Sequence, residues 1–343
     1  MHTNLPSKDR IVQLDILCNL PFSKPLYEVA EKLNIEDEYC KNCHVFCFYG
    51  KYEFEDLLFA VDHLEKYGRN KVALNRAGTS ACYQYFSIDR IIKMLDSAIN
   101  SNENSKIDKY AACKLLEFVH EQNDISLNEK ARLDLLYLEY FDEDTYNIKP
   151  TALFTRIVME PEYFCILLNC IYGNRKDNTE EITEASLIHI ANLFFDFKCV
   201  PGTDEIGLFH EKQFNSWMNY VKKWSKENDL FRIAMHTVGN GFFYVLKDDD
   251  NLPNEVILNE LNVFANDFLR EGYKTALFNH IGAISITPDG KEALEVARGF
   301  ETSSLAAEKK GFSRVSTLYR ELADQFKAEA KTDYKRFVSR LND

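Results

Sequence analysis

Glycine and proline are scarce in this sequence. There are 13 glycines and 8 prolines among 343 residues, which is about half of their usual combined share. No proline occurs between Pro25 and Pro150, and no glycine occurs between Gly78 and Gly173. Turn-dense β-sandwiches and barrels need these residues at their turns, so both folds are disfavoured. Long intervals without helix breakers instead favour helices joined by short polar loops.

The chain also lacks an excess of positive charge and any long apolar run. Its 54 acidic and 41 basic residues give a net charge of −13, and such a surface repels phosphate backbones and anionic lipids. The uncharged stretch 163–174 is too short to span a bilayer, and residues 1–10 have no export signal. We therefore expect no general nucleic-acid binding, no membrane association and a cytoplasmic location.

The nine cysteines are an odd number and are mostly isolated from one another. Six of them stand singly among apolar or aromatic neighbours, as buried free thiols do in a reducing compartment. These six are Cys18, Cys82, Cys113, Cys165, Cys170 and Cys199.

Apolar residues recur at helical spacing through most of the chain. One such stripe runs to Tyr67 and is followed by Gly68, which predicts a helical hairpin over 63–74. Ser126 and Glu129 form a capping box, and Pro161 stands at the first turn of another apolar run. Further helices are predicted at 9–20, 25–33, 88–99, 108–121, 211–226, 230–238, 253–271 and 313–341.

The sequence therefore predicts an all-α fold. The successive helix pairs suggest an irregular α-solenoid of antiparallel pairs, with at most one short β-hairpin near residues 274–287. No fixed repeat period can be aligned. We expect two domains: a HEAT- or TPR-like array of helix pairs over 1–200, and a C-terminal helical domain over 201–343 that carries the short hairpin and a long final helix.

The sharpest cluster of candidate metal ligands is Cys40, Cys43, His44 and Cys47. Two cysteines at CxxC spacing with a nearby histidine and a third cysteine could ligate zinc. A structural zinc site usually draws ligands from a second, distant knuckle, however, and none is visible. The same cysteines also fit the buried stripe of an amphipathic helix. Core packing is the favoured interpretation, and we expect no metal and no cofactor.

Three other short motifs are weaker candidates for metal or nucleotide binding. Glu117 and His120 have the E-x-x-H spacing of a di-iron site, but no second copy exists. The acidic stretch 248–251 lacks the glycine and glutamate of a calcium loop. Gly239 and Gly241 form a G-x-G without a preceding strand, so this is not a dinucleotide fingerprint.

Two groups of residues are candidates for ligand binding. Trp217 and Trp224 lie on one predicted helix and could stack on a ligand, although core packing with a lysine-rich outer face is the favoured interpretation. Asn279, His280 and Gly282 form the turn of the predicted hairpin, which interrupts an otherwise helical chain. Recognition loops are commonly found in such places.

From residue 149 onward the order of elements resembles the C-terminal region of large bacterial multidomain proteins with HEAT- or TPR-like helical tails. The residues that carry this resemblance are 150–154 with 161–164, 201–204, 272–279 with Gly282, and 318–323 with Tyr334. Such proteins look like defence or sensor proteins whose effector lies at the other end. The resemblance implies no catalytic residue, and the cysteine cluster at 40–47 is not part of it.

Two classes of function are open. The first is a non-enzymatic protein-interaction or sensor module on a helical scaffold that binds a protein partner, and the resemblance places it in bacterial defence. The second is a hydrolase or nuclease whose acidic and histidine residues are dispersed along the chain. No hydrolase, P-loop, zinc-protease or kinase motif is present, so an enzyme is the less favoured of the two.

Overall fold

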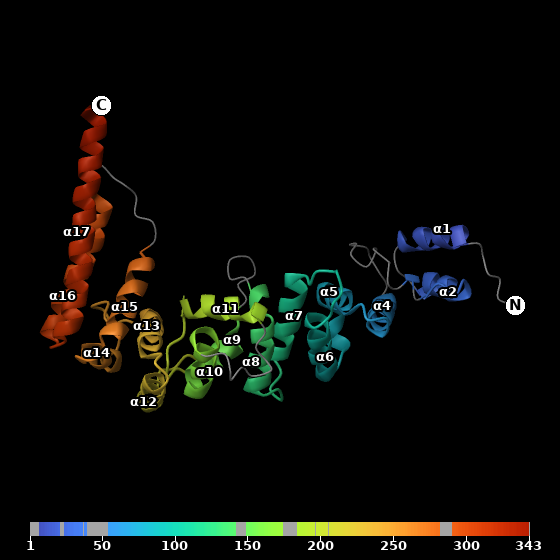
Figure 1. Ribbon diagram of the computed structural model, residues 1–343, viewed down its shortest axis with the longest axis horizontal. Coiled ribbons are helices and arrows are strands. Elements are labelled where there is room, and N and C mark those ends of the chain that lie inside the picture. Colours follow the sequence, from blue (N-terminus) through green and yellow to red (C-terminus); the bar gives the residue numbers. More distant parts are fainter. Residues whose placement is uncertain are drawn as a thin grey trace. The chain divides into compact units, whose positions relative to one another are not determined.

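The computed structural model describes residues 7–20, 24–36, 38–39, 54–141, 149–173, 184–195, 197–204, 206–281 and 290–342. The fold is all-α: the protein is 75% helical, with 16 α-helices and no strand among these residues (Figure 1). Two isolated β-bridges, Thr203 with Phe209 and Lys247 with Pro253, are present instead. The chain divides into two compact units, Met1–Leu153 and Phe154–Asp343. The polar stretch near residue 200, which we expected at the main boundary, lies within the second unit.

The first unit is built from short helices. They are α1 (Ser7–Cys18), α2 (Lys24–Lys32), α4 (Phe54–Lys66), α5 (Asn70–Ser80), the 3-10 turn η2 (Cys82–Tyr85), α6 (Ile88–Ile99), α7 (Lys109–His120), α8 (Leu127–Leu136) and η3 (Leu138–Tyr140). Helix α9 (Thr151–Met159) carries the chain from the first unit into the second.

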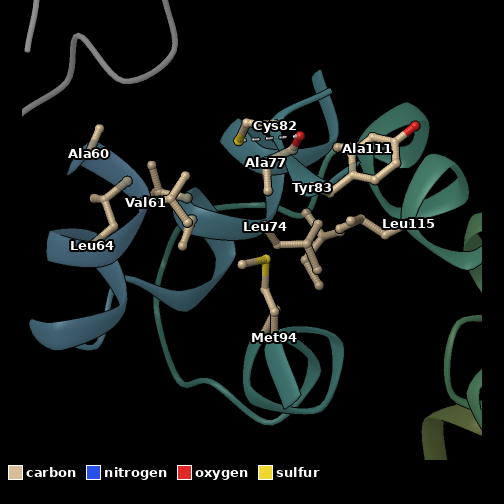
Figure 2. Packing of buried hydrophobic residues seen from close by; sticks show 14 of the residues in the cluster. Ala60, Val61, Leu64, Leu74, Ala77, Cys82, Tyr83, Met94, Ala111 and Leu115 are labelled. Carbon is tan, nitrogen blue, oxygen red and sulfur yellow. Dashed lines mark hydrogen bonds between the residues drawn. The ribbon is translucent and has the colours of Figure 1, made fainter. Parts of the chain in front are cut away.

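Helix α5 is the centre of the first unit, because it packs against α4, α6 and α7. Figure 2 shows its Leu74 and Ala77 between side chains from these neighbours, including Val61 of α4 and Met94 of α6. All four side chains are buried. Burial of large apolar side chains such as these contributes roughly 1.5–3 kcal/mol each, so this cluster is the main source of the unit's stability.

The second unit contains the longer helices. They are α10 (Pro161–Tyr172), α11 (Glu184–Phe195), α12 (Glu211–Glu227), α13 (Phe231–Gly241), the 3-10 turn η5 (Phe242–Tyr244), α14 (Glu255–Asn262), α15 (Asp267–Asn279), α16 (Lys291–Lys309) and α17 (Ser313–Asn342). Helices α16 and α17 form a long helical hairpin (Figure 1). The buried stripe of α17 includes Leu318, Tyr319, Leu322 and Phe326, and the Tyr319 hydroxyl lies 2.8 Å from that of Tyr273 on α15.

Most predicted helix boundaries are confirmed within one to three residues. The helix predicted at 88–99 is α6, and the Ser126 hydroxyl accepts the backbone N–H of Glu129 at 3.2 Å, as the capping box requires. Gly68 ends the first helix of the predicted hairpin with φ of 72°. The six isolated cysteines are all buried and free, as expected.

The single helix predicted over 253–271 is wrong, because the structure has two helices there, α14 and α15. The backbone between them turns without proline or glycine and is held by side chains instead. The Arg270 guanidinium donates to the carbonyls of Leu261 and Val263, and the Asn266 amide donates to the carbonyl of Glu260 at 2.8 Å. These bonds satisfy carbonyls that a helix end leaves unpaired.

The first strand of the predicted hairpin is also wrong, because residues 274–279 belong to helix α15. The apolar residues 276–278 look like a strand in isolation. With Leu269, Gly272 and Tyr273 they complete a buried helical face that packs on α13. The second predicted strand and Gly282 lie outside the described residues.

No helix in the described part of the chain combines the length and apolar character that a membrane span requires.

Candidate ligand pocket

A pocket of about 200 Å³ lies in the second unit between helices α10, α11, α13 and α15. Its walls combine aromatic and polar side chains, which is typical of small-ligand sites. The lining residues are Tyr172, Phe194, Phe195, Arg232, Ile233, His236, Thr237, Asn240, Thr275 and Asn279.

The close approach of α13 and α15 positions the polar side of this pocket. A β-carbon on Gly239 would overlap the backbone carbonyl of Leu269, and one on Gly272 would overlap that of His236. Only glycine permits two helix backbones to lie this close. The sequence motif 239–241 is therefore a packing motif.

Helix α13 presents its polar residues to the pocket along one face. Arg232, His236 and Asn240 are four residues apart, so they lie in a row on the helix. Thr237 and Asn240 are buried, His236 is partly buried and Arg232 is exposed. The row therefore runs from a charged rim to a buried polar end.

The buried end of the row has an unsatisfied hydrogen-bond acceptor. Asn240 is only 8% exposed, and its amide nitrogen donates to the backbone carbonyl of Phe195 at 3.3 Å. Its amide oxygen is buried without a hydrogen-bond partner. A buried acceptor in this state costs roughly 1–3 kcal/mol, and this one is enclosed by the protein rather than open to the pocket.

The His236 imidazole is held in its neutral form at neutral pH. Burial lowers its pKa, Glu271 opposes the shift and the positive charge of Arg232 adds to it. A neutral imidazole offers one donor and one acceptor nitrogen.

The rim of the pocket carries exposed aromatic side chains. Phe195 is 79% exposed and Tyr172 is 45% exposed. Ile188, which is 66% exposed, lies seven residues before Phe195 and therefore on the same side of α11. We call Tyr172, Ile188 and Phe195 the α11 surface.

Of the four predicted binding residues that the structure describes, one lines this pocket. Asn279, the last residue of α15, is exposed and lines the rim. His280 follows it but is occupied elsewhere: its Nδ1 lies 2.9 Å from the Ala276 carbonyl, its Nε2 lies 2.8 Å from the Tyr244 hydroxyl, and its ring stacks on Phe243. His280 thus fastens the C-terminus of α15.

The two tryptophans, both on α12, are not among the pocket-lining residues. Trp217 is fully buried, its indole nitrogen donates to the Ile157 carbonyl at 3.1 Å, and its ring meets Phe164 edge-on. Trp224 is half-buried.

The predicted cysteine cluster, Cys40, Cys43, His44 and Cys47, lies outside the described residues. Within the part of the chain that the structure describes, no group of three or more histidine, cysteine, aspartate or glutamate side chains is arranged to hold a metal ion.

A buried histidine–aspartate pair in the first unit was missed by the sequence reasoning, which considered His120 only with Glu117. The Nε2 of His120 lies 2.8 Å from Oδ1 of Asp134, whose side chain is fully buried. Burial raises the pKa of Asp134, while His120 and the backbone N–H groups of Leu153 and Ala152 oppose the shift. Glu117 instead pairs with Lys114.

Five of the six described cysteines have a pKa raised by burial and offer no activated thiolate. Burial raises the pKa of Cys113 to about 11 and that of Cys165 to about 12, and it also raises those of Cys82, Cys170 and Cys199. Nucleophilic cysteines need the opposite shift.

A second, wider hollow of about 480 Å³ lies between α15 and α17. Its charged residues are largely paired with one another. Lys274 pairs with Glu321 at 2.6 Å, Arg270 pairs with Asp267, and Arg314 lies over the ring of Phe264. The hollow therefore has less unsatisfied bonding capacity than the pocket beside α13.

No protein-family model, curated protein or solved structure matches the chain. One sequence signal could have located Asn240: the last turn of α13 contains two glycines, and glycine within a helix costs about 1 kcal/mol relative to alanine. Their presence at 239 and 241 indicates a close approach on both sides of that residue.

Proposed function

We propose that the protein is a non-enzymatic interaction or sensor module on an α-helical scaffold, and that it binds its protein partner through the α11 surface. The observation that carries this proposal is the exposure of Ile188 and Phe195 on one side of α11, next to a pocket that Tyr172 and Phe195 line. Large exposed apolar side chains beside a concave site are typical of interaction surfaces.

The wider context of the proposal comes from the sequence. An acidic chain with net charge −13 favours a partner whose surface is basic around the contact, because complementary charge accelerates association. We place the module in the cytoplasm, arranged as an irregular α-solenoid, and in bacterial defence on the strength of the sequence resemblance.

A hydrolase with dispersed residues is the second candidate, and the His120–Asp134 pair is the observation in its favour. A buried aspartate that orients a histidine supplies two of the three members of a catalytic triad. Among the described residues, the cysteine on the same helix as His120 is not activated: burial raises the pKa of Cys113 to about 11, and its thiol donates to the Tyr140 carbonyl at 3.6 Å. We therefore rank this function second.

Site-specific photo-crosslinking tests the interaction proposal. A photoreactive phenylalanine analogue replaces Phe195 in the full-length chain, and the crosslinked species are identified by mass spectrometry from native cells. We expect a discrete crosslinked protein partner. Its affinity for the purified chain should fall at least tenfold in Phe195→Ala, because truncating an aromatic anchor commonly costs 2 kcal/mol or more.

Phe264 supplies the matched control, because it is a phenylalanine of the same unit that is 75% exposed and lies outside the α11 surface. The analogue at Phe264 should not crosslink the same protein, and Phe264→Ala should leave the affinity unchanged. Equal crosslinking from both positions, or none from Phe195, would refute the proposal.

A further inference from the structure

The loops that precede helices α12 and α14 have the same local structure. Asp204 and Asp248 each accept, through Oδ1, the backbone N–H groups two and four residues further on, at 3.1 and 2.8 Å in both loops. The residue three positions after the aspartate has a left-handed backbone in each loop: Gly207 with φ of 83° and Asn251 with φ of 60°. Helices α12 and α14 both begin seven residues after the aspartate. The loop therefore recurs 44 residues later, within the spacing of about 40–47 residues that is typical of HEAT-like helix pairs.

The helices before these loops correspond at the same spacing. Ile190 and Phe194 of α11 are buried, and so are Ala234 and Val238 of α13, each 44 residues later. We call α11, its loop and α12 the first repeat, and α13, its loop, α14 and α15 the second repeat. Their sequences differ at most positions, so the repeat is visible only in the structure. Residues 44 apart on α11 and α13 thus lie on the same side of their helices.

In the second repeat, α15 covers one side of α13 (Figure 1). The backbone of α13 at His236 and Gly239 lies against the backbone of α15, and the guanidinium of Arg232 lies 5.5 Å from the centre of the Phe268 ring. The contacts therefore follow α13 at positions 232, 236 and 239, which share one side of a helix.

Helices α13 and α15 run in the same direction and stay in contact along their length. Near the start of both helices, the rings of Phe231 and Phe268 meet edge-on with centroids 6.4 Å apart. At their ends, the rings of Phe243 and His280 stack with centroids 3.8 Å apart. These two contacts are twelve residues apart on each chain segment, so the helix axes are close to aligned.

In the first repeat, the corresponding side of α11 faces solvent. The positions 44 residues before the three contact positions of α13 are Ile188, Asn192 and Phe195. All three are exposed, and two of them belong to the α11 surface. The side of the helix that α15 covers in the second repeat is therefore uncovered in the first.

We infer that the partner covers this side of α11 with one amphipathic α-helix, laid along α11 as α15 lies along α13. The inference rests on the proposed function and names the kind of partner segment that the α11 surface binds. Such a helix presents apolar side chains to Ile188 and Phe195 and a polar one to Asn192, at the spacing of one helix face. The net charge of −13 favours lysine and arginine on the flanks of the partner helix.

The distance between two anchors distinguishes a helix from an extended segment. Ile188 and Phe195 are seven residues apart, which is about 10.5 Å along the axis of α11. A partner helix aligned with α11 spans this distance with about seven residues. An extended segment rises about 3.3 Å per residue and spans it with about three.

Photo-crosslinking from both anchors measures this spacing. A photoreactive phenylalanine analogue replaces Ile188 in one full-length chain and Phe195 in another, and tandem mass spectrometry maps the crosslinked residues of the partner. We expect both crosslinks in one partner segment, about five to nine residues apart. A separation outside this range, or crosslinks in two unrelated segments, would overturn the inference and leave the proposed function intact.

Synthetic peptides of the crosslinked segment, about five helical turns or 18 residues long, test the helix itself. A central residue on the side facing away from the anchors becomes proline in one peptide and alanine in its matched control. Proline breaks a helix and alanine favours one. By fluorescence anisotropy on the purified full-length chain, we expect the alanine peptide to bind as the native one does and the proline peptide to bind at least tenfold more weakly. Equal binding of the two would overturn the inference.

Variants of the chain locate the binding of the native peptide. Its affinity should fall at least tenfold in Phe195→Ala and stay unchanged in Phe264→Ala, and an equal loss in both would contradict the assignment. Crosslinks to a second copy of this chain, or to another segment of the same chain, would show a different occupant of α11 and overturn the inference. No crosslinked partner from either anchor would refute the proposed function and this inference together.

Discussion

Helices meet closely at a glycine in both units, but their surroundings differ. In the first unit a β-carbon on Gly78 of α5 would overlap the backbone of Ala111 on α7, and the neighbouring Leu74 and Ala77 are fully buried. In the second unit, Gly239 and Gly272 bring α13 and α15 together, and polar residues flank the contact. The same packing device therefore closes a core in one unit and positions a polar pocket in the other.

Substitutions of the glycines at the two close helix contacts should have the largest effect on stability. Gly78→Ala and Gly272→Ala each force a β-carbon into the backbone of a neighbouring helix. We expect each to lower the free energy of unfolding by about 1–3 kcal/mol, the usual cost of overpacking. Urea denaturation followed by circular dichroism measures the change.

Gly299 of α16 is the matched control, since a β-carbon there meets nothing within 4 Å. Gly299→Ala should raise the stability by up to about 1 kcal/mol, because alanine is the better helix former. If Gly272→Ala stabilised the chain as Gly299→Ala does, the close α13–α15 contact would be refuted.

Asp134, a buried polar residue in the first unit that pairs with His120, should make the stability of the protein depend on pH. The folded-state pKa of Asp134 is raised above its ordinary value of about 3.9. The carboxyl group therefore contributes stability below that pH, and this contribution is lost as the pH rises through the folded-state pKa. Asp134→Asn does not titrate at this position, so the stability of the wild type relative to this variant should fall from about pH 4 towards neutrality.

Urea titrations of the wild type and Asp134→Asn at a series of pH values provide the measurement. A relative stability that stays constant, or that rises with pH, would show that burial does not raise the pKa of the Asp134 carboxyl group. The side chain also accepts the backbone N–H of Leu153 at 3.0 Å, a bond that asparagine can keep. Asp134→Ala should therefore be less stable than Asp134→Asn by about 1 kcal/mol.

Substitutions at the C-terminus of α15 should have the smallest effects on stability. They should also distinguish the structural role of His280 from that of its neighbour Asn279. His280→Ala loses two side-chain hydrogen bonds and a stacked ring, so we expect a cost of about 1 kcal/mol. Asn279→Ala removes an exposed side chain at the pocket rim and should change stability by less than about 0.5 kcal/mol. Thermal denaturation of both variants tests this order, and a larger loss in Asn279→Ala would reverse the two roles.

Much of the fold was predictable from the sequence, because local signals determine helix ends. The Ser126 cap, Pro161 at the start of α10 and Gly68 after α4 each act within one turn of the chain. The break between α14 and α15 had no such signal. It depends on Arg270 and Asn266 reaching back to carbonyls several residues away, which no local pattern reveals.

The pocket was less predictable for the same reason. Asn279 was chosen because it was expected in a turn, and it lines the pocket from the end of a helix instead. Asn240 and His236 come from a helix whose polar face becomes a pocket wall only because α10, α11 and α15 surround it. The pair His120–Asp134 joins residues 14 positions apart on two helices, so its proximity depends on packing between helices.

Crosslinking from the α11 surface is the measurement that tests the central claim most directly. The account predicts that a photoreactive analogue at position 195 captures one protein partner, that the analogue at position 264 does not, and that Phe195→Ala weakens the purified complex at least tenfold while the chain stays folded. A partner captured equally from both positions, or an affinity unchanged in Phe195→Ala, would contradict the claim that this surface carries the protein's function.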